Sequence, residues 1–357
     1  MSLSSRFQRA AALAILSLPA PLLRLLVGTP PRSPDGLQLD LQSQVLRTLM
    51  RITGISELHA GGVSRARRAM EASAPTLGSR VDDVAVSPST VPGAEGPRRA
   101  LVYTPRGAVA AGMRPGLVFF HGGGFVLGSL DSHDLVCREL ASKAGLVVVS
   151  VDYRLAPEHP FPAGPDDAVA ATRWVLAHAG SLGIAADAVA VGGDSAGGNL
   201  AAVVAQALRG EPRTPAFQLL FYPVTNFTRP GRSHQYFADG YVLTKASMDW
   251  FEENYIPGVS RTDPRVSPFF AKDLSGLPPA LVITAGFDPL RDEGGAYAEA
   301  MRKAGVDVEY VCAEGSMHGF VNLSGALDES ARMMGLAADR LRRALAPRAA
   351  RSVAPAA

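Results

Sequence analysis

The chain has 357 residues, of which 47% are hydrophobic and 19% charged, and its formal net charge is +2 at pH 7. This composition is ample for a hydrophobic core, and the small net charge argues against nucleic acid as the main partner. Cys137 and Cys312 are too few for a disulfide scaffold, and no cluster of cysteine and histidine predicts a metal site.

The first apolar run, residues 10–18, follows Arg6 and Arg9. An apolar run after basic residues is typical of a secretion signal, but Pro19 and Pro21 interrupt this one early. The run is too short to span a membrane, so we expect no stable membrane insertion. We expect a cytoplasmic protein, with a secretion signal or a membrane-surface anchor as open alternatives.

From residue 81 onward, short apolar runs alternate with helical patterns. The runs that predict strands are 81–86, 100–103, 117–120, 146–151, 188–191, 217–222, 281–284 and 306–312. The segments that predict helices are 132–144, 165–178, 196–208, 292–304 and 326–345. This alternation indicates an α/β fold with a mostly parallel sheet and helices on both faces. No helical pattern separates the first two runs, so we expect that pair to be antiparallel.

A glycine-rich segment, residues 121–125, follows the predicted strand 117–120 and reads HGGGF. Glycines after a buried strand allow backbone N–H groups to come close to a substrate oxygen. Hydrolysis of an ester places negative charge on that oxygen, and donors already in position stabilise it. The sequence His-Gly-Gly-Gly is typical of the oxyanion loop of lipases and esterases.

The most informative segment is residues 191–199, which reads VGGDSAGGN. It places Gly-x-Ser-x-Gly between a predicted strand and a predicted helix, which is the context of a nucleophile elbow. Ser195 would lie on the sharp turn, where Gly193 and Gly197 leave room for strand and helix to approach each other. The N–H of Ala196, the next residue, would complete the oxyanion hole.

A serine nucleophile needs a base, and in α/β-hydrolases the base follows the serine in the chain. Only His234 and His318 follow Ser195. His234 lies in a polar stretch with no strand before it. His318 comes after the predicted strand 306–312 and an expected loop, residues 314–317, at the sheet edge where functional sites collect. We therefore assign His318 as the base.

The base in turn needs a carboxylate that orients it. Two candidates, Asp288 and Asp292, follow the predicted strand 281–284. Asp288 is near the strand end and could point along the sheet edge toward His318. Asp292 lies where a helix begins, and its ordinary role there would be an N-terminal charge or cap. We therefore favour Asp288 as the acid.

These motifs resemble those of the bacterial hormone-sensitive-lipase family of α/β-hydrolases, whose elbow reads GDSAGG. The resemblance extends to residues 153–163 (YRLAPEHPFPA), 288–293 (DPLRDE) and 318–320 (HGF). It runs from about residue 81 to 345, and more loosely through the N-terminal region. It implies an α/β-hydrolase fold with a helical cap. The site residues that it implies are the triad Ser195, Asp288 and His318 and the oxyanion donors Gly123, Gly124 and Ala196.

A segment rich in aromatic residues interrupts the alternation of predicted strands and helices between Pro223 and Leu281. A loop of that length usually has a function or its own structure, and residues 245–255 have helical spacing. We expect this segment to cover Ser195 together with N-terminal cap helices, which the resemblance implies. The predicted division is 1–50 for the N-terminal part of the cap, 51–223 for the first part of the hydrolase core, 224–265 for the cap insertion, 266–346 for the second part of the core, and 347–357 for a disordered tail.

These features predict a serine carboxylesterase that needs no cofactor and acts on hydrophobic small-molecule esters with short or medium acyl chains. A homodimer is an open possibility. Gibberellin receptors of the same family bind without hydrolysis and lack the catalytic histidine, so His318 argues against that class. An amidase or peptidase with the same triad is the other alternative. Oligopeptidases of this fold carry a large extra domain that 357 residues cannot hold.

Overall fold

The computed structural model describes residues 12–53, 58–73, 77–107 and 113–346. Eight strands form one sheet in the order β1-β2-β4-β3-β5-β6-β7-β8. The strands are β1 (Val84–Gly93), β2 (Gly96–Pro105), β3 (Arg114–Phe120), β4 (Val147–Val151), β5 (Ile184–Asp194), β6 (Phe217–Phe221), β7 (Ala280–Phe287) and β8 (Val308–Met317).

The sheet is antiparallel at one edge and parallel elsewhere. β1 pairs antiparallel with β2, and β2 pairs antiparallel with β4. All remaining neighbours are parallel. The predicted mostly parallel sheet with an antiparallel start is confirmed. Strands such as β4, of sequence VVVSV, are buried at every position because helices cover both faces of the sheet.

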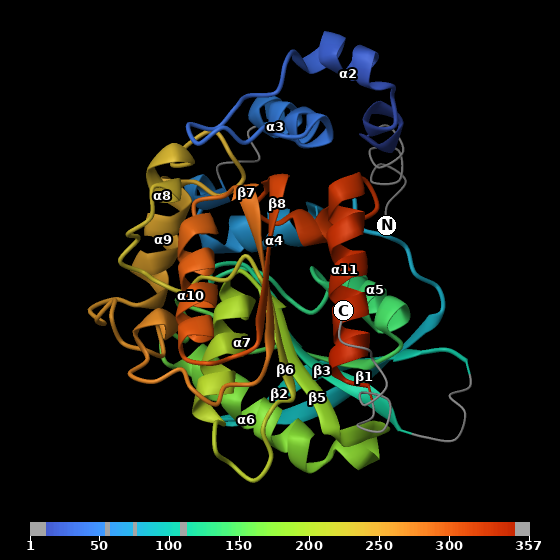
Figure 1. Cartoon of the computed structure of the whole chain (residues 1–357), viewed down its shortest axis with the longest axis vertical. Coiled ribbons are helices and arrows are strands. Elements are labelled where there is room, and N and C mark those ends of the chain that lie inside the picture. The colour runs from blue at the N-terminus through green and yellow to red at the C-terminus, as the bar shows by residue number, and fades with distance from the viewer. Residues whose placement is uncertain (1–11, 54–57, 74–76, 108–112, 347–357) are drawn as a thin grey trace.

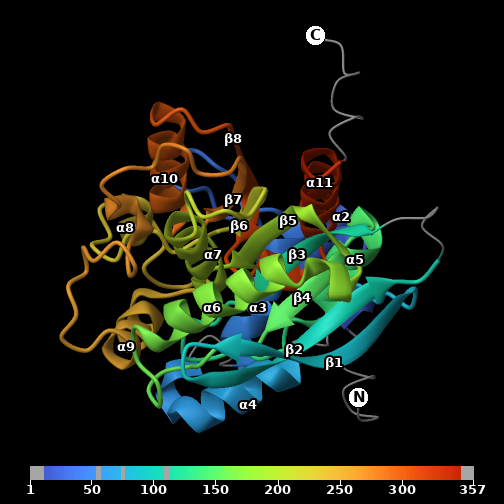
Figure 2. The ribbon, with the colours of Figure 1, turned by 90° about the horizontal axis from the view of Figure 1, so that it is seen from below.

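Two layers of helices enclose the sheet (Figure 1). Helices α6 (Ala163–Ala177), α7 (Ala196–Ala207) and α10 (Arg291–Lys303) pack on one face, and α5 (Asp134–Ala144) and α11 (Asp328–Ala344) pack on the other. The other helices that the structure describes in the central and C-terminal parts are η2 (Ala179–Leu182), α8 (Ser233–Tyr236), α9 (Lys245–Tyr255), η3 (Pro268–Phe270) and η4 (Phe320–Leu323). Seen from below, the β1–β2 hairpin lies at one side of the molecule (Figure 2). Helix α4 spans Val63–Ser73.

β8 is longer than the sequence indicated. Residues 314–317 were expected to be a loop, but they are the last residues of the strand. Pairing with β7 continues past a register shift between Ala285 and Phe287. Gly286 permits this close approach, since a Cβ there would lie 1.9 Å from the carbonyl oxygen of Glu314. The expectation was wrong because backbone pairing extends the strand beyond the point where the alternation of side chains ends. His318 therefore follows the strand directly.

The N-terminal helices α2 (Ala20–Val27) and α3 (Leu41–Thr53) lie over the end of the sheet where β7 and β8 finish (Figure 1). The N–H of Asp40 donates to the carbonyl oxygen of Gly315 in β8 at 3.0 Å. Leu39 is fully buried in a cluster with Phe237, Phe287 and Met317. This region therefore packs on both the core and the segment after β6. The 3-10 helix η1 (Leu58–Gly61) and α4 follow it.

Parts of some predictions lie outside the described residues, namely Arg6, Arg9 and the tail 347–357. Among the helices that the structure describes, none has both the length and the apolar character needed to cross a membrane.

Candidate active site

Ser195 lies on the turn between β5 and α7, with a positive φ of 55° and a ψ of −116°. Non-glycine residues rarely adopt such angles, and strained backbone of this kind is concentrated at functional sites. The flanking glycines make the turn possible, because a Cβ on Gly193 would lie 2.4 Å and one on Gly197 only 1.9 Å from the carbonyl oxygen of Phe120. The sequence therefore folds into the predicted elbow, with the Ser195 side chain at the cavity described below.

A chain of hydrogen bonds joins Ser195, His318 and Asp288. Nδ1 of His318 lies 2.7 Å from Oδ2 of Asp288, and Nε2 lies 3.0 Å from Oγ of Ser195. Asp288 is fully buried, and its Oδ1 accepts the N–H of Leu290 at 2.9 Å. With an accepting carboxylate at Nδ1, the neutral imidazole holds its proton there and presents the lone pair of Nε2 to the serine hydroxyl. This is the geometry in which an imidazole can remove the serine proton.

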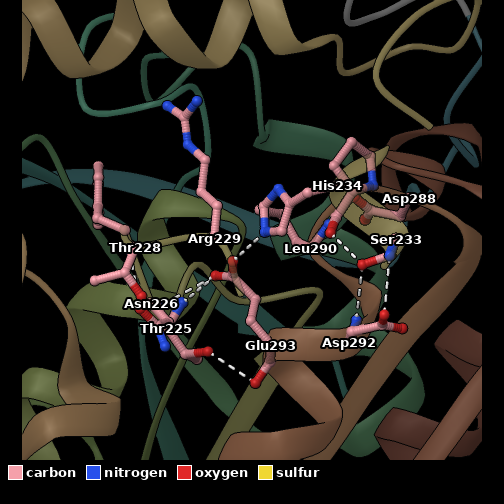
Figure 3. A network of polar contacts seen from close by, with 12 residues as sticks. Thr225, Asn226, Thr228, Arg229, Ser233, His234, Asp288, Leu290, Asp292 and Glu293 are labelled. Atoms are coloured by element: carbon pink, nitrogen blue, oxygen red, sulfur yellow. Dashed lines mark hydrogen bonds and ion pairs between the residues drawn. The ribbon is translucent and has the colours of Figure 1, made fainter. Parts of the chain in front are cut away.

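Asp292 and His234, the other two candidates, have different hydrogen-bond partners. Oδ2 of Asp292 accepts the N–H of Ser233 at 2.9 Å (Figure 3). His234 contacts Glu293, with Nε2 lying 2.8 Å from Oε2. Of the two aspartates and two histidines weighed from the sequence, the structure thus brings only Asp288 and His318 to Ser195.

The glycine-rich loop after β3 lies against the elbow. The N–H of Gly122 donates to Oδ1 of Asp194 at 2.9 Å, which ties the loop to the residue before Ser195. Gly123 and Gly124 have positive φ angles of 121° and 61° and line the same cavity as Ser195. Ala196 is the first residue of α7, where the helix dipole and the free N–H groups favour an anion. Gly123 and Gly124 thus line the cavity that contains Ser195, and Ala196 follows Ser195 directly in the chain.

Two buried histidines, His121 and His133, lie beside this loop and Asp194. Burial would raise the pKa of the Asp194 carboxyl, but the charge and hydrogen bond of His133 and the N–H of Gly122 outweigh burial and lower it. Burial, together with the neighbouring His133, lowers the pKa of His121 to about 4. His121 is therefore neutral at pH 7, and Asp194 is ionised beside the nucleophile.

Most of the apolar side chains that line the cavity at Ser195 come from the segment after β6, and Leu290 comes from the turn after β7. The side chains from the segment after β6 are Val224, Phe227, Val242, Leu243, Met248, Trp250 and Phe251. Helix α9 covers the oxyanion loop, since a Cβ on Gly124 would lie 2.3 Å from the ring of Phe251. Arg229 forms ion pairs with two residues of this helix, Asp249 and Glu252. Nη2 of Arg229 lies 2.8 Å from Oε2 of Glu252.

The sequence did not identify several residues of the cavity wall. From the N-terminal region, His59 and Met70 line the cavity, and both lie beyond the predicted cap boundary at residue 50. The division of the chain into cap and core remains a prediction. A polar group also lines the wall and is made up of Asn226, Arg229, His234 and Glu293 (Figure 3). Only one feature of the sequence pointed to this polar group. It was the acidic pair at the start of the predicted helix 292–304, whose second member, Glu293, is buried.

Among the described residues, no group of three or more histidine, cysteine, aspartate or glutamate side chains has an arrangement that could hold a metal ion.

The chain matches a known protein family and several known proteins. Residues 117–322 match the model of a family described as having the alpha/beta hydrolase fold. The chain is 45% identical over 318 residues to carboxylic ester hydrolase LipN of Mycobacterium tuberculosis, covering 86% of this chain and 83% of that protein. It is 38% identical over 281 residues to ethyl acetate hydrolase of Pseudomonas putida, covering 76% of this chain and 87% of that one.

A solved structure agrees. The chain is 44% identical to an alpha/beta hydrolase from the metagenome of Lake Arreo, with a TM-score of 0.81 over 85% of this chain and 98% of that one. The fold and the matched family define an α/β-hydrolase. The chain belongs to the hormone-sensitive-lipase family of these hydrolases and is a carboxylesterase, as the motifs predicted.

Proposed function

We propose that this carboxylesterase acts through Ser195, with His318 as base and Asp288 as the residue that orients it. The observation that carries the proposal is the continuous hydrogen-bonded chain from Asp288 through His318 to the Ser195 hydroxyl. Oγ of Ser195 attacks the ester carbonyl carbon while Nε2 of His318 takes the hydroxyl proton. Asp288 holds the ring with its proton on Nδ1 and stabilises the imidazolium that forms.

The oxyanion of the tetrahedral intermediate is held by the N–H groups of Gly123, Gly124 and Ala196. Loss of one such donor typically costs about 3 kcal/mol of transition-state stabilisation. Collapse of the intermediate breaks the bond to the alcohol, which leaves with the proton from His318. Water, activated by the same imidazole, then attacks the acyl-serine and releases the acid. These steps need no metal or other cofactor.

We further propose that the substrates are hydrophobic esters with short or medium acyl chains. The cavity beside Ser195 has a volume of about 180 Å³ and is lined mainly by aromatic and aliphatic side chains. An apolar cavity of about 150 Å³ accommodates a benzene molecule, so this space suits a small acyl or alcohol group. The name ethyl acetate hydrolase, which belongs to a relative, is in keeping with a small ester.

A series of 4-nitrophenyl esters with two to sixteen acyl carbons tests this proposal. Each buried methylene adds about 0.8 kcal/mol only while the cavity has room. We therefore expect kcat/KM to peak at roughly four to eight carbons and then to fall, because longer chains outgrow the cavity. A steady rise to the longest ester would contradict the proposed chain length. Matched butyrate ester and butyranilide substrates distinguish an esterase from an amidase, and we expect the ester to be strongly preferred.

A further inference from the structure

Helices α2 and α3 carry most of the large apolar side chains that the described part of the chain leaves exposed. In α2 the exposed fractions are 48% for Leu22, 83% for Leu25 and 59% for Leu26, which we call the outer leucines. Ile52 in α3 is 74% exposed, and Met113 is the other such side chain among the described residues. Helix α2 lies at the outer end of the molecule, beyond α3 (Figure 1). Exposed apolar side chains gathered in one place usually mark a surface that binds a partner or a membrane.

The outer leucines are not the residues that attach α2 to the rest of the protein. Leu23 has that role, since it is only 3% exposed and packs in one cluster with Val45 of α3 and Leu327. The second and third outer leucines lie three and four residues after the first, so all three share another side of the helix. A surface helix normally has polar residues on the side away from the core. Helix α2 instead presents an apolar face to its surroundings.

The same two helices are basic. They contain Arg24, Arg47 and Arg51 and no aspartate or glutamate. Arg24 and Arg51 are exposed, and neither has an ion-pair partner among the described residues. A groove of about 200 Å³ is lined by residues of both helices, including Leu26, Arg47 and Arg51. Basic and apolar side chains therefore adjoin each other on this face.

The acidic residues close to these helices do not offset that charge. Oδ2 of Asp35 lies 2.6 Å from Nη2 of Arg291. Asp40, just before α3, accepts a backbone N–H of the helix at 3.0 Å. Oδ2 of Asp328 accepts a hydrogen bond from the side chain of Gln42 in the first turn of α3, whereas the exposed arginine and isoleucine of α3 lie in its last turn. The exposed face therefore combines positive charge with apolar side chains.

We propose that this face, made up of the outer leucines, Ile52, Arg24 and Arg51, binds the surface of an anionic lipid bilayer. In helices that lie on a membrane, leucines enter the boundary between headgroups and acyl chains. Arginines beside them are attracted to the negative charge of the lipids. The binding is reversible and no part of the chain crosses the membrane. This inference goes beyond the proposed hydrolysis and does not depend on it.

A second copy of the chain fits this face less well than a bilayer does. In a symmetric dimer the same face of each copy meets itself. Arg24 and Arg51 of both copies would then lie in one interface, with no acidic residue of α2 or α3 to pair with them. Like charges brought together in an interface repel each other, whereas anionic lipids supply the opposite charge.

The first experiment measures cosedimentation of the full-length wild-type protein with sucrose-loaded vesicles. One set of vesicles is phosphatidylcholine alone, and in the other about one third of the lipid is phosphatidylglycerol. We expect binding to the anionic vesicles to be stronger by roughly ten-fold or more, because each exposed arginine near an anionic surface adds to the attraction. Raising the salt concentration should weaken this binding, since salt screens the charges.

The second experiment compares apolar variants on the anionic vesicles. Leu25→Gln changes the most exposed of the outer leucines, and we expect it to weaken binding by roughly ten-fold, because one buried leucine is lost from the lipid interface. Met113→Gln is the matched control, since it makes the same kind of change at an exposed position outside the two helices. We expect it to bind as the wild type does.

The third experiment compares charge variants. Arg24→Gln combined with Arg51→Gln should reduce the binding to anionic vesicles to near that for neutral vesicles. Arg342→Gln combined with Arg343→Gln removes the same charge from the last turn of α11 and should keep the preference of the wild type. The residues changed in these experiments do not line the cavity, so unchanged hydrolysis of 4-nitrophenyl butyrate in solution verifies that each variant is folded.

Three results would overturn the inference. They are equal binding of the wild type to the two sets of vesicles, equal binding by Leu25→Gln and Met113→Gln, and equal binding by the two charge variants. A dimer that Leu25→Gln dissociates in sedimentation equilibrium, without binding to vesicles, would assign the face to a second copy instead. Vesicle binding is measured without turnover, so a failure of this inference is distinguishable from a failure of the proposed role of Ser195.

Discussion

Asp288 and Asp292 are close in sequence, yet their carboxylates have different surroundings. Asp288 is fully buried, and its Oδ2 lies 2.7 Å from Nδ1 of His318. Asp292 lies at the start of α10, and its Oδ2 accepts the N–H of Ser233. We predict that Asp288→Asn lowers kcat by roughly 10⁴, because an amide favours the wrong tautomer of the imidazole. Asp292→Asn is the matched control and should change kcat far less. Steady-state kinetics with 4-nitrophenyl butyrate compares them, and the reverse order would show that the acid is wrongly assigned.

His121 makes the stability of the protein depend on pH. Burial, with a contribution from His133, lowers its pKa from 6.5 to about 4. Between these two values the unfolded chain binds a proton on this imidazole and the folded chain does not. The free energy of unfolding therefore decreases as the pH falls from 6.5 to 4, by a total of about 3 kcal/mol from this residue.

The test measures urea unfolding of the wild type and of His121→Gln at several pH values from 4 to 7. We predict that the variant loses less of its unfolding free energy over this range than the wild type does, because a glutamine side chain does not titrate. Equal losses in the two proteins would contradict the assigned pKa.

The sequence predicted the residues at Ser195 because local patterns and chain order were enough to find them. A Gly-x-Ser-x-Gly turn, a histidine after a strand and an aspartate after another strand converge at one sheet edge. The contact between His234 and Glu293 could not be predicted in this way. Its partner Glu293 is held by backbone N–H groups of Thr225 and Asn226, which are remote from it in the sequence. A single sequence carries no signal for that contact.

At the scale of elements, strands inside the parallel sheet, such as β4, β6 and β7, were predictable because they are buried on both faces and read as unbroken apolar runs. The end of β8 was not, since its last residues are held by pairing with β7 rather than by an apolar pattern. The walls of the cavity were only partly predictable. The helical spacing of residues 245–255 predicted helix α9. The lining residues from η1 and α4 were not predictable, because their place in the wall depends on how the N-terminal region packs.

The docking of the N-terminal region provides the prediction at this scale. Leu39, just before α3, is fully buried against Phe237, Phe287 and Met317, whereas Leu25 in α2 is 83% exposed. Leu39→Ala should lower the free energy of unfolding by about 2–5 kcal/mol, because it removes buried methyl groups and leaves a cavity. Leu25→Ala, the same change at an exposed position, should have little effect. Similar losses in the two variants, measured by chemical denaturation, would show that the N-terminal region does not pack in this way.

At the scale of the whole molecule, the sheet, the oxyanion loop and the segment after β6 converge on one cavity. The sheet supplies Ser195, Asp288 and His318 from the ends of β5, β7 and β8. The loop after β3 supplies Gly123 and Gly124, and α9 closes over them. We therefore propose that the core supplies the catalytic groups, while the size and polarity of the substrate depend on the segments that cover it.

The most direct test of this account is the turnover of esters by Ser195→Ala. The substitution removes only the hydroxyl, so the variant should keep the circular dichroism spectrum and unfolding midpoint of the wild type. Its hydrolysis of 4-nitrophenyl butyrate should fall to a residual rate of roughly 10³–10⁴ over water, which the oxyanion donors and substrate binding alone can sustain. Near-normal turnover by the folded variant would contradict the central claim that Ser195 is the nucleophile.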